Sequence, residues 1–271
     1  RPGSIRDPER RQNSLTAART SLMTPLVKPE LLSMSIVRTG AALLLGFVPM
    51  ASLHSAEAPP PQSLTREQVV AQTMAPYTGP TEKGVDRSTL NGKIMCGYQG
   101  WFAAEGDGCG RGWYHWHGRN GFQPGSCKID LWPDVSELDP DERYAPAFKH
   151  ADGRAAEVFS SFNAKTVRRH FQWMRDYGLD GVFVQRFASE VSNPSGLRQF
   201  TTVLGHCREG ANRYGRTYAV MYDLSGLGAG RMERVMADWR LLVETMRITE
   251  DPAYLHHDGK PVVAVWGFGF S

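Results

Sequence analysis

From about residue 93 onward, short apolar runs alternate with longer segments of helical periodicity. The apolar runs predict four strands, and a predicted helix precedes each of the last three of them. The predicted strands cover 93–102, 180–187, 217–226 and 261–270, and the predicted helices cover 163–178, 195–215 and about 231–246. Nearly continuous apolar strands that alternate with helices are typical of a parallel sheet covered on both faces.

The predicted helices carry recognisable start and stop signals. Asn163 is a good N-cap residue for the first of them, and Gly178 ends it. The third helix has an apolar stripe that is expected to face inward. This stripe consists of Met232, Val235, Met236, Trp239 and Leu242.

Two α/β architectures fit this rhythm, a doubly wound sheet and a (β/α)8 TIM barrel. The first strand is not followed by a Gly-x-Gly-x-x-Gly turn into a helix, which disfavours a dinucleotide site and a cofactor of that kind. The barrel is therefore preferred. Because a whole barrel needs about 250 residues, we expect the four strands to form its N-terminal half.

The first 56 residues have the composition of a leader rather than of a folded domain. Arg38 precedes an apolar run over 41–48, and small residues follow at Ser55 and Ala56. This order is typical of a secretory signal peptide, here behind an over-extended start. A short membrane anchor or a buried helix is the alternative. The signal-peptide interpretation predicts a secreted or periplasmic protein with no stable membrane span after cleavage.

The remaining chain divides into two parts. Residues 57–84 are Pro-rich at their start and predict a linker and a disordered lead-in. Residues 85–271 form the predicted barrel domain. The formal net charge of +3 arises in the leader, where residues 1–56 hold seven Lys/Arg and three Asp/Glu. Without the leader there is no basic excess, so we expect no nucleic-acid partner.

The chain has four cysteines, and an exported protein can form disulfides. Cys109 and Cys127 lie in one Gly-rich loop, so spacing favours them as a pair. Cys96 and Cys207 fall in apolar strand and helix patterns and are expected to be packed thiols.

Polar and aromatic residues cluster at the ends of the predicted strands, where a barrel carries its functional groups. Arg186 is expected to point into a cup faced by Asp223, or else to form a purely structural bridge to it. The candidate substrate-binding residues at these ends are Trp101, Gln185, Arg186, Tyr222, Asp223 and Trp266.

A long loop after the first strand is rich in Trp, His and Gly, and loops of this length are often functional. Trp132 and Asp134 complete the set of candidate substrate-binding residues. His115 and His117, with Asp130, also suit a metal site, but ordinary loop hydrogen bonding is the preferred interpretation, so no metal is predicted.

Several long motifs support a resemblance to a known group. The motifs are "KIMCGYQGWFAAEGDGCGRGW", "IDLWPD", "FKHADG", "VFSSFNAKTVRRHFQWMRDYGLDGVFVQRF", "MYDLSG" and "GKPVVAVWGFGF". Over about 85–271 the chain resembles bacterial secreted xylosidase/arabinosidase-like proteins. It is similar, more distantly, to glycoside hydrolase family 99, the endo-α-mannosidases.

The resemblance implies a TIM barrel that acts on a plant-type or microbial oligo- or polysaccharide. Arg186 and Phe187 stand where family 99 has two tryptophans, and Asp223 stands where it has a glutamate, so mannose specificity does not carry over. The resemblance places the catalytic glutamates of the family in its C-terminal half, beyond Ser271. No catalytic residue is therefore assigned in this chain.

A glycosidase normally needs two carboxylates at a fixed separation. We expect Asp223 and Arg186 to bind substrate hydroxyls, with stacking from Trp101, Trp132 and Trp266, while the reacting pair lies elsewhere. The alternatives are a secreted glycan-binding protein without turnover, an inactive fragment, and a metal-dependent hydrolase.

Overall fold

The computed structural model describes residues 64–228 and 231–267, which all belong to one compact unit, Pro59–Ser271. The predicted leader lies outside the described residues, as does the end of the last predicted strand, 268–270. Among the helices of the described ranges, none combines the length and the apolar character that crossing a membrane requires.

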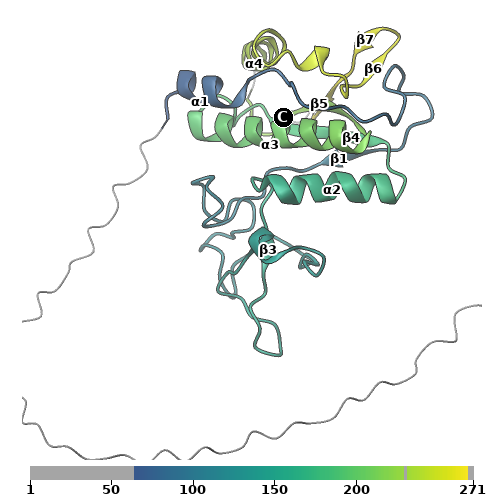
Figure 1. Ribbon diagram of the computed structural model, residues 1–271. Coiled ribbons are helices and arrows are strands. Elements are labelled where there is room, and N and C mark those ends of the chain that lie inside the picture. The colour runs from purple at the N-terminus through teal and green to yellow at the C-terminus, as the bar shows by residue number, and fades with distance from the viewer. Residues whose placement is uncertain (1–63, 229–230, 268–271) are drawn as a thin grey trace, which may run out of the picture. The chain divides into compact units, whose positions relative to one another are not determined.

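Four parallel strands form the central sheet (Figure 1), so the chain is mixed α/β as the sequence predicts. The strands are β1 (Met95–Tyr98), β4 (Gly181–Phe187), β5 (Thr217–Asp223) and β8 (Val263–Trp266). They lie side by side in the order in which they occur along the chain, β1-β4-β5-β8.

The register of the sheet decides which side chains share a face. Phe187 lies opposite Asp223, and Asp223 lies opposite Trp266. Because successive strand residues point to opposite faces, Gln185 shares the face of these three residues. Arg186, between Gln185 and Phe187, points to the other face.

Helices cover the face to which Arg186 points. They are α2 (Ala164–Asp176), α3 (Pro194–Tyr214) and α4 (Met232–Glu244). Figure 1 shows α3 running alongside β4 and β5, which it contacts. The side chain of Asn163 accepts a hydrogen bond from the Lys165 amide and begins α2, as predicted. Gly215, with φ +60°, ends α3 in the left-handed conformation that suits glycine.

The apolar stripe of α4 differs from the prediction. Met232 and Met236 are 45% and 53% exposed, whereas Val235, Asp238 and Leu242 are buried. The buried positions of α4 thus include the carboxylate of Asp238, which a prediction from apolar residues alone does not identify.

Residues 57–84 contain an ordered helix, α1 (Arg66–Thr73), so the prediction of a disordered lead-in is wrong for this part. Thr65 and Gln68 form a capping box, in which each side chain accepts a hydrogen bond from the other residue's backbone amide. Val69 and Met74 are fully buried and belong to the same core as the sheet. The helix packs against α3.

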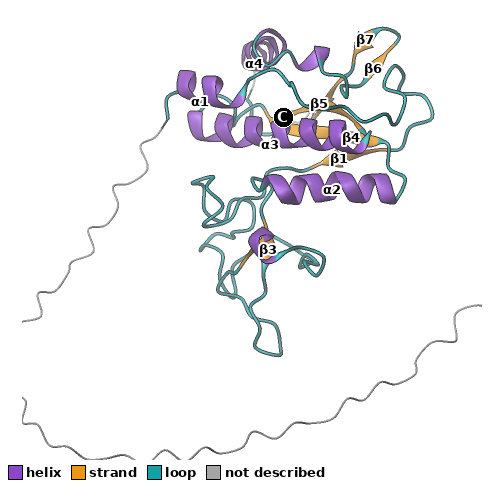
Figure 2. Ribbon diagram, viewed as in Figure 1, coloured by secondary structure: helices purple, strands orange, loops and turns teal. Residues whose placement is uncertain are grey.

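The segment between β1 and α2 is mostly loop (Figure 2), with only short regular elements. These are the 3-10 helix η1 (Pro140–Glu142) and the two-residue strands β2 (Arg143–Tyr144) and β3 (Val158–Phe159). An aromatic cluster gives this segment its own core, built around Trp116, Phe122 and Val158. The remaining short elements, η2 (Ile248–Glu250), β6 (His256–His257) and β7 (Lys260–Pro261), precede β8.

All four cysteines are free thiols. Cys109 is buried and Cys127 is exposed, so the expected disulfide between them is not present. Cys207 is buried and Cys96 is partly buried, in line with their prediction as packed thiols.

A buried ion pair joins β4 to α4. Arg186 Nε lies 2.7 Å from Asp238 Oδ2, and Arg186 Nη2 lies 2.8 Å from Asp238 Oδ1. The Tyr222 hydroxyl donates to the same carboxylate at 2.6 Å, and Arg186 Nη2 also donates to Thr201 of α3 at 3.2 Å. The network therefore connects two strands with two helices.

Replacing Asp238 should be costly, because it leaves the Arg186 guanidinium buried without its counter-charge. We expect Asp238→Asn to lower the free energy of unfolding by about 3–5 kcal/mol. Urea denaturation followed by circular dichroism measures this. The control is Glu250→Gln, which breaks an exposed ion pair with Arg247 and should cost about 0–1 kcal/mol. Equal, small effects for both variants would contradict the prediction.

Candidate functional site at the strand ends

The C-terminal ends of β4 and β5 bring Gln185 and Asp223 together, as the sequence analysis expects. The Gln185 side-chain amide donates a hydrogen bond to Asp223 Oδ2, and the Ser225 backbone amide donates to Asp223 Oδ1 at 2.8 Å. Gln185 is 7% exposed and Asp223 is 3% exposed. The carboxylate is thereby fixed in orientation at the end of its strand.

Aromatic residues lie beside this pair at the strand ends. The Trp101 and Phe187 rings stack with their centroids 4.9 Å apart and an interplanar angle of 21°. Trp266 lies beside Asp223 in the sheet and is 54% exposed. We call the five residues on this side of the sheet the strand-end site: Trp101, Gln185, Phe187, Asp223 and Trp266.

Two of the predicted site residues lie on the opposite face. Arg186 does not face Asp223 but pairs with Asp238, and Tyr222 also donates to Asp238. The prediction that Arg186 and Asp223 share one cup is therefore wrong. The cause is the pleat of the strand, which sends Gln185 and Arg186 in opposite directions.

Trp132 and Asp134 belong to the loop segment rather than to the strand ends. The Trp132 ring stacks on Phe122 at 5.7 Å, and its indole nitrogen donates to the Glu157 carbonyl at 3.1 Å. Asp134 is exposed, and its carboxylate accepts a hydrogen bond from the Ser136 amide at 2.8 Å. Among the residues that the structure describes, no hydrogen bond or ring contact joins either side chain to the strand-end site.

His115, His117 and Asp130 do not assemble into a metal centre within the described residues. His117 Nδ1 lies 2.8 Å from the Trp113 carbonyl oxygen, which is the loop hydrogen bonding that the sequence analysis prefers. The His115 ring instead stacks on Trp101, with centroids 4.9 Å apart.

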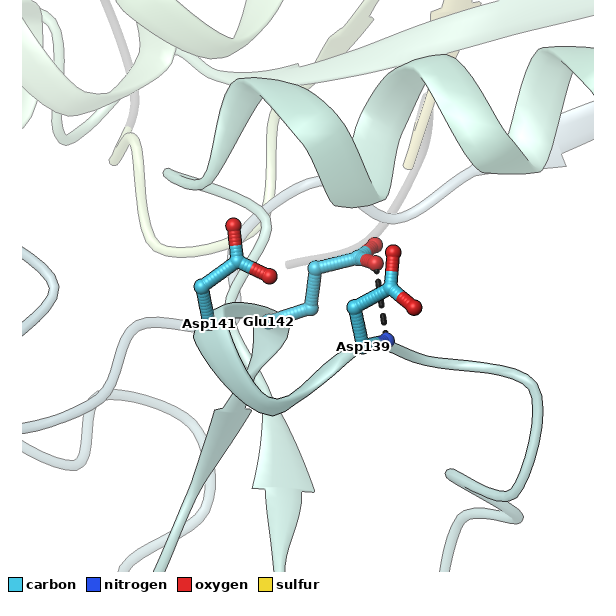
Figure 3. Close-up of side chains that lie close together, drawn as sticks. All are labelled: Asp139, Asp141 and Glu142. Carbon is cyan, nitrogen blue, oxygen red and sulfur yellow. Dashed lines mark hydrogen bonds between the residues drawn. The ribbon is translucent and has the colours of Figure 1, made fainter.

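Three carboxylates at the start of the 3-10 helix η1 do lie close together: those of Asp139, Asp141 and Glu142 (Figure 3). Lys165 and Arg169 occupy this cluster. Lys165 Nζ lies 2.7 Å from Asp139 and 2.8 Å from Asp141, and Arg169 Nη2 lies 2.6 Å from Glu142. Hydrogen bonds from Lys165 lower the pKa values of Asp139 and Asp141. Two cations thus already pair with all three carboxylates, and these ion pairs connect η1 to α2.

The sequence analysis missed two groups near the site. The side chain of Phe187 points to the same face of the sheet as that of Gln185. The spacing of two residues within one strand indicates this. Arg111 of the long loop forms an ion pair with Glu190 just after β4, at 2.8 Å. No local pattern in the sequence signals this second contact, because 79 residues separate the partners.

Comparisons with known proteins give a distant structural similarity. No family model matches the chain, and no curated protein sequence is similar to it. The solved structures that match include a GH99 endo-alpha-mannosidase from Bacteroides thetaiotaomicron, with 20% identity over 65% of this chain and 46% of that one, and a TM-score of 0.39. The same enzyme in complex with BIS-TRIS-propane matches with 16% identity over 64% of this chain and 41% of that one, and a TM-score of 0.37. The chain spans less than half the length of these structures.

A second histidine lies near a strand end, and its burial makes stability depend on pH. The Tyr98 hydroxyl, at the end of β1, lies 2.8 Å from His170 Nδ1. Burial lowers the pKa of His170 to about 4, against about 6.5 in an unfolded chain. Between these two values the unfolded chain binds the proton and the folded protein does not. The contribution of His170 to the free energy of unfolding is therefore fully present above about pH 6.5, and it is lost as the pH falls toward 4.

Replacing His170 should flatten this pH dependence. We expect the wild-type protein to lose about 3 kcal/mol more than His170→Phe between pH 7 and pH 4. Urea denaturation at several pH values measures the difference. His150→Phe, at an exposed loop position, is the matched control and should follow the wild type. Parallel curves for all three proteins would show that His170 does not titrate in this window.

Proposed function

We propose that residues 85–271 form the N-terminal part of a (β/α)8-barrel domain of the glycoside hydrolase type. Its ligand is an oligo- or polysaccharide of plant or microbial origin, as the xylosidase/arabinosidase-like motifs imply. The observation that carries the proposal is the strand-end site, where a fixed carboxylate and amide lie among exposed and stacked aromatic rings.

The order of the strands supports the barrel. In a doubly wound sheet the strand order reverses, and the ligand binds where it does so. The four strands β1, β4, β5 and β8 show no reversal, since each lies beside its predecessor. A barrel is built by this sequential parallel addition, and its functional groups lie at the C-terminal ends of the strands.

The chemistry of the site suits a sugar. Asp223 accepts hydrogen bonds and Gln185 can both donate and accept them, which matches the hydroxyl groups of a glycan. The flat ring of Trp266, half exposed beside Asp223, offers an apolar surface for the face of a sugar ring. A few fixed polar groups among aromatic side chains are the usual composition of a small-molecule site.

The catalytic carboxylates are proposed to come from strands beyond the four described. Hydrolysis of a glycosidic bond usually requires two carboxylates, and Asp223 is the one acid that ends a described strand of the sheet. This observation also favours a second candidate, a glycan-binding protein without turnover.

We further propose that the protein is exported, because residues 1–56 have the pattern of a signal peptide.

Asp223→Asn tests the proposed site. We expect the variant to bind the cognate glycan about 10–100-fold more weakly, because a hydrogen bond to a charged group is replaced by a neutral contact. Calorimetry against xylo-, arabino- and manno-oligosaccharides measures affinity, and chromatography of the products measures turnover. Asp134→Asn, on the exposed loop, is the control and should bind like the wild type. Equal affinity of Asp223→Asn and wild type would refute the site. The turnover assay uses the protein together with the proposed further strands, and binding without products there would select the second candidate.

A further inference from the structure

His115 has a backbone conformation that is uncommon outside glycine. Its φ angle is +65°, a left-handed value that, outside glycine, only Arg247 and Asp258 share among the described residues. Non-glycine residues in this region are uncommon and are concentrated at functional sites, where the surrounding structure enforces them. In this conformation the His115 ring lies against the strand-end site, 4.9 Å from the Trp101 ring and 5.7 Å from the Phe187 ring between centroids.

Arg111 holds the loop that carries His115. Its Nη2 lies 2.8 Å from Glu190 Oε2 and its Nη1 lies 2.7 Å from Gln199 Oε1. Its guanidinium carbon lies 3.5 Å from the centroid of the Tyr114 ring, the residue next to His115. The side chain is 13% exposed. Arg111 therefore joins the loop to the end of β4 and to α3 at once.

Gln199 fixes the other partner of the His115 ring. Its side-chain amide donates to the Trp101 carbonyl at 2.6 Å while its oxygen accepts from Arg111. Gln199 is completely buried. The backbone of Trp101 and the loop before His115 are thus positioned by one side chain, which explains how the stacked rings keep their arrangement.

The ring nitrogens of His115 are available for a ligand. Within the described ranges, neither nitrogen forms a hydrogen bond to another residue, whereas His117 and His170 each use a ring nitrogen in this way. Burial, aided by the charges of Lys128 and Arg111, lowers the pKa of His115 to about 4. At neutral pH the ring is therefore neutral, with one donor and one acceptor nitrogen.

We propose that His115 determines specificity at the strand-end site by exchanging a hydrogen bond with a hydroxyl group of the glycan. Arg111 is its positioning residue. This inference rests on the proposed function and names a group that recognises the sugar there. A hydroxyl group can both donate and accept a hydrogen bond, as a neutral imidazole can. The two groups therefore complement each other, and the ligand needs no charge.

His115→Phe tests the role of the ring nitrogens, because phenylalanine keeps the stacking and removes the hydrogen bond. We expect the glycan dissociation constant to rise about 3–10-fold. His115→Asn keeps a polar side chain and tolerates the left-handed backbone, so it should recover part of the affinity. His150→Phe is the control for a histidine replaced at an exposed position. Thermal melts verify that the variants are folded.

Arg111→Met, alone and combined with His115→Phe, tests positioning. If Arg111 acts through His115, the single variant weakens binding, and the double variant binds no more weakly than His115→Phe alone. A merely structural role would weaken binding further in the double variant and would overturn the positioning role. Binding that depends on Asp223 but is unchanged in His115→Phe would overturn this inference alone. If no glycan of the panel binds the wild type, the proposed function and this inference both fail.

Discussion

The buried ion pair between Arg186 and Asp238 is the interaction on which the arrangement of the site depends. Taking both charges out of water is costly, so the pair is tolerated only because its geometry is bidentate and Tyr222 and Thr201 supply further hydrogen bonds. With Arg186 committed to the helices, its neighbours Gln185 and Phe187 must point to the other face. One residue that looks functional in the sequence therefore sets the direction of two that line the site.

The sequence predicts the larger part of this fold for clear physical reasons. The strands and helices follow from hydrophobic periodicity, and the capping residue Asn163 marks the start of α2 correctly. The helix α1 could also have been found, because Thr65 and Gln68 have the spacing of a capping box. The Pro-rich stretch before it instead favours a linker.

The site itself was predictable only in part. The ends of parallel strands identify Gln185 and Asp223, but treating every polar residue at a strand end as a site residue ignores the alternation that removes Arg186. The contacts of Arg111 and His115 depend on how a long loop folds back onto α3, and neither composition nor periodicity specifies such a contact. Phe187 and Trp101 show the same limit, since their stacking joins residues 86 positions apart along the chain.

The state of the four thiols has a practical consequence for studying the loop segment. Burial raises the pKa of Cys96 and of Cys207, and raises that of Cys109 to about 12, so these three thiols are poor nucleophiles. Cys127 is the exposed one. An electrophilic dye should therefore attach there without prior mutagenesis, which gives a spectroscopic reporter within the same long loop that carries His115.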